Sequence, residues 1–439
     1  MKKLLLTLTV ITVGFLGIQA QPPSDSSPKY PSGATYTLSD GSTVTKTGET
    51  LESSTQYYNV VQVSNGTLNL SGCTFTKTGD GSSGDNSSFY GNNSTIYAGA
   101  ASSSNYESTT AGSSAKIVIT NGTVTSNSQG ANAVFATNGA TITVDGITIT
   151  NNKSVSRGLH CTYGGIINAS NVDITTNEAT SSTIATDRGG GTVTVNGGTA
   201  TANGSKSAVL YSTGTITATG LTGTSAVGEI AVIEGDNSIA MTSCTMTSGS
   251  SERGLLMMQS GSGDASGTNP SMTITGTSLT MTDSSAPLLE VATCVTATCT
   301  LDNCAVSVPS GILMYVMADS QWSTSGAIGN LILSNGTYSG IVKYDSGYTA
   351  NVTVNSGAVW NLTANTAIST LVNNGTVNLN GYTLTYNSMS GSGTINESTG
   401  IHNVSSGSNE AKAYTLDGRQ ASRDTKGIII QNGRKVVRK

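Results

Sequence analysis

A repeat of about 25 residues runs through most of this chain. In five successive copies an apolar residue occupies the same position of the repeat, and we call such an equivalent position a step. The residues at this step are Val134, Leu159, Ile184, Leu210 and Val232, at spacings of 25, 25, 26 and 22 residues. Each copy holds about three short segments rich in Val, Ile and Thr, separated by Gly, Asn or Ser, which is the pattern of strands and turns. A strand residue rises about 3.3 Å, so one copy is long enough for a three-sided coil. Self-similarity of this length is typical of solenoids.

The repeat therefore predicts an all-β chain in which equivalent strands of successive coils pair in parallel. Coils of this size resemble the right-handed parallel β-helix (pectin-lyase-like) family, and the composition, with 53 Gly, 7 Pro and 5% aromatic residues, agrees with it. The alternative is a β-sandwich with a turn every 8–12 residues, which does not account for a period of 25. We expect one solenoid over residues 35–400, of roughly fourteen or fifteen coils. Residues 80–115 and 260–270 exceed a coil and predict loops.

The first twenty residues have the form of a secretory signal. Lys2 and Lys3 precede a short apolar run that ends at Ala20, and a Pro-rich segment follows. A cleaved leader over residues 1–20 and a linker over 21–34 are expected, in preference to a transmembrane anchor. The mature chain is then extracellular or at the outer-membrane surface of a bacterium, with no transmembrane span.

Charge is concentrated near the C-terminus. Eight of the 20 Lys and Arg residues lie in residues 411–439, beside only two of the 25 acidic residues. The body of the chain is therefore acidic, which argues against nucleic acid as a partner. The basic tail is expected to be a separate module.

The six cysteines fit a core better than a disulfide framework or a zinc site. Cys73, Cys244 and Cys304 occupy an inward-facing step that other coils fill with Ile147 or Val172, so they are expected to fill the core. A disulfide bridge between neighbouring coils remains the alternative.

Threonine alternates with Asp, Asn and Ala at equivalent steps, so no uniform threonine face is expected.

The motifs that mark enzymes of this fold are missing. The chain contains no Asp-Asp pair, no Asn-Thr-Asp and no Gly-His-Gly, and its two histidines, His160 and His402, cannot form a two-histidine metal site. No metal and no cofactor are expected. Whether the chain is an enzyme stays uncertain, although these absences favour a non-enzyme.

Acids from distant coils can still meet, because equal steps of a solenoid stack into columns. If the chain is an enzyme, the candidate catalytic residues are Asp187, Arg188, Glu234, Asp264 and Asp319. A pair of carboxylates would support glycoside cleavage, and an acid with Arg188 would support a lyase. The alternative is that turns simply tolerate charge. The candidate ligand-binding residues are Asp187, Arg188, Tyr211 and Trp322.

The tail over residues 401–439 departs from the repeat. Its order of elements, Tyr414, Leu416, Gly418-Arg419, Ile428 to Ile430 and the closing Lys435-Val436-Val437, resembles the C-terminal sorting domain of Bacteroidetes. That resemblance implies type IX secretion machinery as a partner. A plain β-hairpin with Asn432-Gly433 as its two-residue turn is the alternative.

The rest of the chain resembles adhesin-like surface proteins built on the right-handed β-helix. This resemblance implies a secreted or cell-surface protein that binds glycans or proteins through its lateral faces and loops. The expected partner is a carbohydrate or a protein of the host or cell surface. A polysaccharide lyase or glycoside hydrolase with acids on the coil turns is the alternative function.

Overall fold

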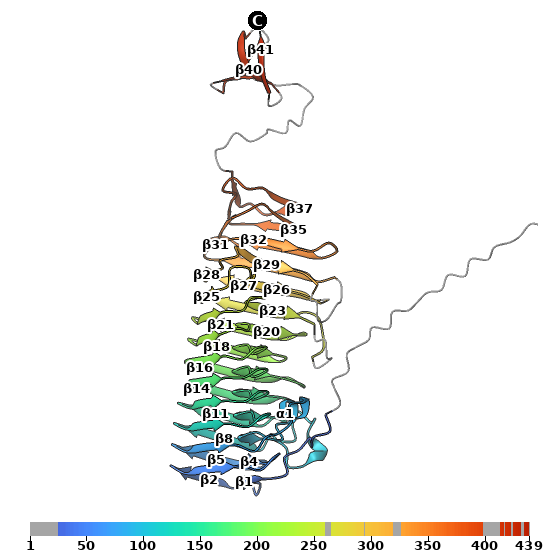
Figure 1. Ribbon diagram of the computed structural model, residues 1–439. Coiled ribbons are helices and arrows are strands. Elements are labelled where there is room, and N and C mark those ends of the chain that lie inside the picture. The colour runs from blue at the N-terminus through green and yellow to red at the C-terminus, as the bar shows by residue number, and fades with distance from the viewer. Residues whose placement is uncertain are drawn as a thin grey trace, which may run out of the picture. The chain divides into compact units, whose positions relative to one another are not determined.

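A computed structural model describes residues 25–259, 265–293, 295–318, 326–397, 413–416, 418–422, 425–431 and 434–438. The chain divides into two compact units, Met1–Asn396 and Glu397–Lys439. The first unit is a stack of parallel strands (Figure 1), which confirms the right-handed parallel β-helix expected from the repeat. Most coils contribute one strand to a 12-stranded sheet, here sheet A, and two strands to a 22-stranded sheet, here sheet B.

Sheet A is the side of the solenoid that positions the candidate site. Neighbouring strands in it come from successive coils, and every pairing is parallel. Its strands are β1 (Ala34–Leu38), β4 (Asn59–Val63), β7 (Ile96–Ala98), β10 (Val134–Ala136), β13 (Leu159–Cys161), β15 (Ile184–Thr186), β17 (Leu210–Ser212), β20 (Ala231–Glu234), β23 (Leu255–Met258), β26 (Leu289–Val291), β29 (Ile312–Val316) and β32 (Ile341–Tyr344).

Sheet B forms the other sides, and it turns a corner within each coil. In the two longest strands the chain runs through that corner without a break. Its strands are β2 (Thr43–Thr47), β3 (Thr50–Ser53), β5 (Gly66–Ser71), β6 (Thr74–Lys77), β8 (Ala115–Thr120), β9 (Thr123–Ser126), β11 (Thr141–Asp145), β12 (Thr148–Asn151), β14 (Gly165–Thr176), β16 (Gly191–Ala202), β18 (Thr215–Thr219), β19 (Thr222–Ser225), β21 (Ser238–Thr242), β22 (Thr245–Ser248), β24 (Ser271–Thr275), β25 (Ser278–Met281), β27 (Thr296–Asp302), β28 (Ala305–Ser307), β30 (Ile328–Ser334), β33 (Thr349–Val354), β35 (Thr366–Asn373) and β37 (Leu384–Ser390).

The last coils are shorter and carry a third, four-stranded sheet. Its strands are β31 (Thr337–Ser339), β34 (Val359–Asn361), β36 (Thr376–Asn378) and β38 (Thr394–Asn396). Trp360 of β34 is fully buried, and its indole Nε1 donates to the carbonyl of Gly340 at 3.0 Å. This tryptophan is therefore part of the core.

Alternate residues of each strand face the core, and the pairing register stacks them into columns. Val134, Leu159, Ile184 and Leu210 form one inward column, as their spacing predicts. The repeat alignment placed Val232 in the same column, and this was wrong. Leu210 pairs with Ala231, and Tyr211 pairs with Val232. A shift of one residue moves a side chain to the opposite face of a sheet, so Val232 faces outward.

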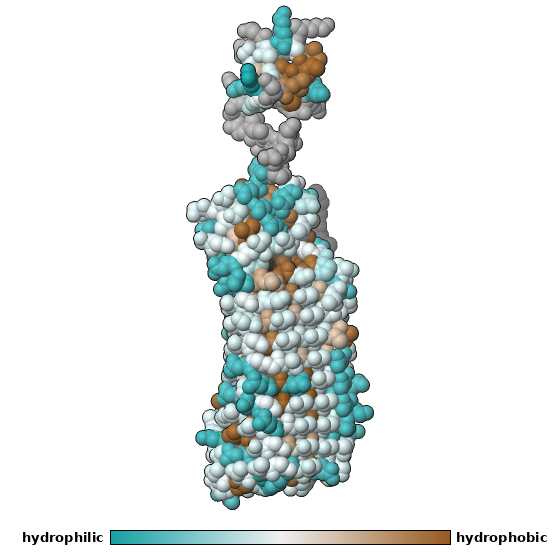
Figure 2. Space-filling view, turned by 90° about the vertical axis from the view of Figure 1, so that its left-hand side faces the viewer, coloured by the Kyte–Doolittle hydropathy of each residue, from teal (hydrophilic) through white to brown (hydrophobic). Residues whose placement is uncertain are grey.

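Threonines form one continuous outward column on sheet B, but the neighbouring outward columns are interrupted at Asn168, Asp173 and Ala240, which confirms the expectation of no uniform threonine face. The register pairs threonine with threonine through eight strands. The column consists of Thr76, Thr125, Thr150, Thr175, Thr201, Thr224, Thr247 and Thr280. β-Branched side chains suit a pleated surface, and residues of near-neutral hydropathy dominate the lateral face in Figure 2.

The cysteines within the described residues are free thiols in the core. Cys73, Cys161, Cys244, Cys299 and Cys304 are all buried and unbridged, which confirms the core reading for these five. Cys294 lies outside the described residues.

The segment 80–115 forms a coil with two enlarged turns. Its β7 belongs to sheet A, and the helix α1 (Asp85–Tyr90) and the 3-10 helix η1 (Ser103–Asn105) lie in the turns on either side. We call residues 79–95, which include α1, the insertion. Most of its described side chains are buried. In the second expected insertion, residues 260–264 lie outside the described residues.

The second unit contains a small antiparallel sheet. Strand β40 (Gly427–Gln431) lies between β39 (Ala413–Thr415) and β41 (Arg434–Arg438). Gln431 pairs with Arg434, so β40 and β41 pair as neighbouring antiparallel strands, while Asn432 and Gly433, the turn expected from the sequence, lie outside the described residues.

Lys77 is a buried lysine at a corner of sheet B. Its Nζ donates to the carbonyls of Thr55 at 2.9 Å and Gly79 at 2.5 Å, which satisfies the two N–H bonds of a neutral amine. Burial lowers the pKa of Lys77 to about 8, and the charge of the Asp80 carboxylate opposes this shift in part.

We predict that the contribution of Lys77 to the free energy of unfolding rises with pH between about 8 and 10.5. In that window the unfolded chain binds the Lys77 proton and the folded chain has lost it. Buried thiols and phenols such as Cys161 and Tyr97, whose pKa values burial raises, lower the stability of parent and variant alike as the pH rises. Urea unfolding should therefore show a difference in the free energy of unfolding, parent minus Lys77→Met, that rises across this pH range. The exposed Lys116→Met is the control, and equal slopes for all three proteins would contradict the prediction.

Candidate functional site

Asp187 and Arg188 begin the turn that follows β15. The backbone N–H of Asp187 donates to the carbonyl of Cys161 at 2.9 Å, which continues the ladder of sheet A. Gly189 and Gly190 follow at φ of 76° and 67°, a left-handed conformation that glycine adopts without strain. A Cβ at Gly189 would overlap the ring of Tyr163, so the glycine also permits a close approach between coils.

The Asp187 carboxylate is buried in an ion pair. Its Oδ2 lies 3.1 Å from Nη2 of Arg157, and both side chains are less than a tenth exposed. Nε2 of His160, on β13, lies 3.8 Å from the same oxygen. Burial, and next the charge of Arg157, hold the pKa of His160 well below its ordinary value. His160 is therefore neutral, and Arg157 supplies the countercharge to Asp187.

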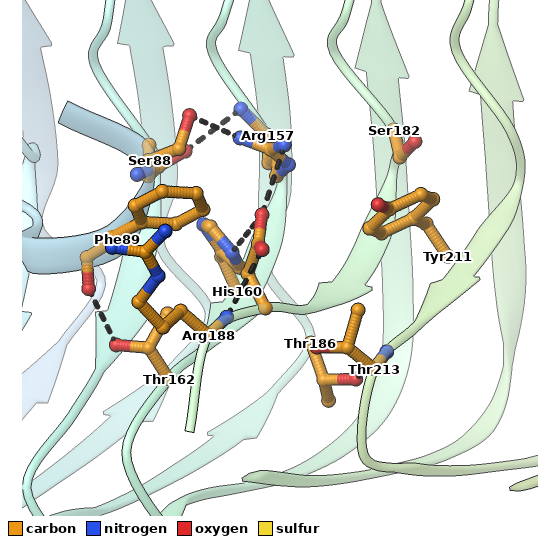
Figure 3. Close-up of polar contacts among 12 residues, drawn as sticks. Ser88, Phe89, Arg157, His160, Thr162, Ser182, Thr186, Arg188, Tyr211 and Thr213 are labelled. Carbon is orange, nitrogen blue, oxygen red and sulfur yellow. Dashed lines mark hydrogen bonds and ion pairs between the residues drawn. The ribbon is translucent and has the colours of Figure 1, made fainter. Parts of the chain in front are cut away.

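The insertion closes this cluster from outside. Nη1 of Arg157 donates to Oγ of Ser88, and Oγ1 of Thr162 donates to the carbonyl of Phe89 at 2.8 Å. The guanidinium of Arg188 lies 4.2 Å from the centre of the Phe89 ring (Figure 3), a cation–π contact. Arg157, Thr162 and Arg188 thus hold the insertion on sheet A, and Asp187 supports it through its pair with Arg157.

Tyr211 and Glu234 lie farther along the same outer face. Tyr211 Oη, on β17, donates to Oε1 of Glu234, on β20, at 2.5 Å. Burial raises the pKa of Tyr211 well above its ordinary value, and the carboxylates of Glu234 and Asp187 raise it further. The register places Glu234 at the step of Asp187 two coils on, about 10 Å away at the usual strand spacing.

A groove opens on the outer face of sheet A at Tyr211. Its first hollow has a volume of about 360 Å³ and is lined by Tyr211, Glu234 and an aliphatic floor that includes Val232, Leu256 and Met258. A second hollow of about 550 Å³ continues along the axis past Glu290 and Tyr315 to Lys343. We call the two hollows together the sheet A groove.

Arg253 lies where the two hollows meet, and carboxylates surround it. Its Nε and Nη1 lie 3.0 Å from oxygens of Glu229 and Glu290, and its Nη2 lies 3.3 Å from Glu252. Burial lowers the pKa of Arg253, but the carboxylates of Glu290 and Glu229 outweigh burial and raise it. The pairing holds the guanidinium in place, so that three carboxylates contact one guanidinium at the centre of the groove, while Lys206 lines the first hollow and Lys343 the second.

Sequence reasoning missed Glu229, Arg253 and Glu290. The sequence did contain a signal for the first two. Glu229 lies two residues before Ala231, and Arg253 lies two residues before its register partner Leu255 in the next coil. Opposite charges at equal steps meet across a ladder. Glu290 was hidden because its partner Leu256 in the register carries no charge.

The remaining candidates Asp264, Asp319 and Trp322 lie outside the described residues. Within the described ranges no group of three or more His, Cys, Asp or Glu side chains is placed to hold a metal ion. None of the helices in that part of the chain has the length and apolar character needed to cross a membrane. Comparisons with models of protein families, with curated proteins and with solved structures find no match.

We predict that Asp187→Asn lowers the free energy of unfolding by about 3–5 kcal/mol, because it leaves Arg157 buried without its countercharge. Urea unfolding measures this loss. Limited proteolysis should show faster cleavage within residues 79–95, since the insertion contacts the same cluster. The partly exposed pair of Lys46 and Glu49 supplies the control Glu49→Gln, which should cost less than about 1 kcal/mol. Equal losses in both variants would refute the structural role of Asp187.

Proposed function

We propose that this chain is an adhesin-like β-helix protein, exported to the bacterial surface, that binds a glycan or protein partner along the sheet A groove. The observation that carries the proposal is the groove itself, which runs across successive coils and combines an aliphatic floor with fixed charges. A groove that crosses successive coils suits an extended polymer, because each coil adds one outward side chain to its lining.

Binding is favoured over cleavage by the state of the acids. Asp187 and Glu234 lie in one column, two coils apart, which is a backbone spacing of about 10 Å. In inverting glycoside hydrolases the two carboxyl groups are at most about 9.5 Å apart. Only Glu234 lines the groove, however, since Asp187 is 3% exposed and paired with Arg157. A hydrolase or lyase remains the second candidate because Glu234, with its Tyr211 hydrogen bond, borders the groove.

Export and surface attachment are supported by the two ends of the sequence. Residues 1–20 have the composition of a signal peptide. The tail resembles a type IX sorting domain in its order of elements, and its described strands form a compact antiparallel sheet.

A panel of glycans, polysaccharides and proteins, scored for both binding and cleavage, tests the function. We expect binding without cleavage, and we expect Leu256→Glu in the groove floor to weaken it at least about tenfold. Asp187→Ala, once it is shown to fold, should leave binding largely intact because Asp187 lies under the insertion. Cleavage that is lost in Glu234→Ala but retained in the parent would favour the enzyme.

Export is tested with a reporter fused to residues 401–439 in a bacterium that has type IX secretion. We expect the fusion to reach the surface or the medium, and a fusion that lacks residues 413–439 to remain in the periplasm. Periplasmic retention of both fusions would refute the sorting role.

A further inference from the structure

The outer face of sheet A already binds a peptide segment, namely the chain's own insertion. Between β7 and β15 this face contacts α1 through aromatic, cationic and hydroxyl groups. Tyr163, in the turn after β13, stacks on Tyr90 of α1 with ring centres 5.8 Å apart and planes 5° apart. The insertion therefore shows that the face accommodates a polypeptide segment with a buried aromatic anchor.

The sheet A groove continues this occupied face along the solenoid. The outward column that contains Phe135 and His160 beside the insertion runs on through Tyr211, Val232 and Leu256 in the groove. Tyr211 and Tyr315 stand four coil steps apart in this column. At the usual strand spacing these steps span about 19 Å, the length of about six extended residues.

The groove differs from the occupied part in its chemistry. Its floor is aliphatic, and Tyr211 packs against the cluster Ala208, Val232, Leu256, Met258 and Ala292. At its centre three carboxylates, Glu229, Glu252 and Glu290, contact the single guanidinium of Arg253. An aliphatic floor favours aliphatic side chains, and the excess of carboxylates favours a cation.

We propose that the sheet A groove is a docking site for a protein segment that places aliphatic side chains on this floor and a lysine or arginine beside the Glu229–Glu252–Glu290 carboxylates. This inference rests on the proposed binding function and names its partner class. A glycan offers hydroxyl groups and ring faces, which match the Val, Leu, Met and Ala floor less well than aliphatic side chains do. The insertion shows a polypeptide on the same face, so a protein partner is favoured.

The test selects random peptides displayed on phage against the full mature chain, with counter-selection on Leu256→Glu. Enriched peptides should combine aliphatic residues with Lys or Arg. In fluorescence anisotropy, labelled copies should bind the parent and lose at least about tenfold in affinity to Leu256→Glu. Glu252→Lys, whose parent side chain is 70% exposed, should also weaken binding, and added salt should weaken it further.

Two matched variants control for general effects of charge. Ile166→Glu changes an exposed aliphatic residue of sheet B, and Glu52→Lys reverses an exposed acid of an N-terminal coil. Both should bind like the parent. Equal binding to all four variants, or enrichment of peptides without basic residues, would overturn the docking site. If no peptide is enriched but a glycan from the panel binds less well to Leu256→Glu, the protein partner is refuted and the binding function stands. If neither class binds, both proposals fail.

Discussion

The structure depends on the parallel hydrogen-bonded ladder between successive coils. Each strand pairs with the equivalent strand of the next coil, so the register repeats from coil to coil and side chains of equal step stack directly. That constraint builds the apolar column that begins at Val134, the threonine column on sheet B and the groove on sheet A. It also makes any charged side chain a neighbour of the residues at the same step one coil away.

The outer face of sheet A shows two uses of this rule. Near the N-terminal coils the face is closed by the insertion, and the buried pair of Arg157 and Asp187 lies beneath it. Farther along, the same columns carry aliphatic side chains and the acids around Arg253, and the face opens into a groove. Asp187 and Glu234 hold equivalent positions in these two regions, but Asp187 pairs with Arg157, whereas Glu234 accepts a hydrogen bond from Tyr211 and borders the groove.

The sequence was sufficient for the fold because the repeat length and the alternation of Val, Ile and Thr constrain every coil in the same way. The inward cysteines, such as Cys73 and Cys304, followed from the same alternation. The irregular coils escaped prediction. Leu210 is followed by a shorter coil, and aligning Val232 instead of Ala231 with it reversed the face of every side chain in that strand. The covering of Asp187 could not be read from the sequence, because it depends on how residues 79–95 fold back over a strand some seventy residues later.

The register of the groove has an evolutionary consequence. Because each coil contacts mainly its two neighbours, duplication of a single repeat in the gene would add one strand to sheet A and two strands to sheet B without disturbing the pairing elsewhere. The groove would lengthen by one coil and keep its chemistry on either side. Variation in repeat number among natural variants is thus a simple route to different ligand lengths, with no need to redesign a core.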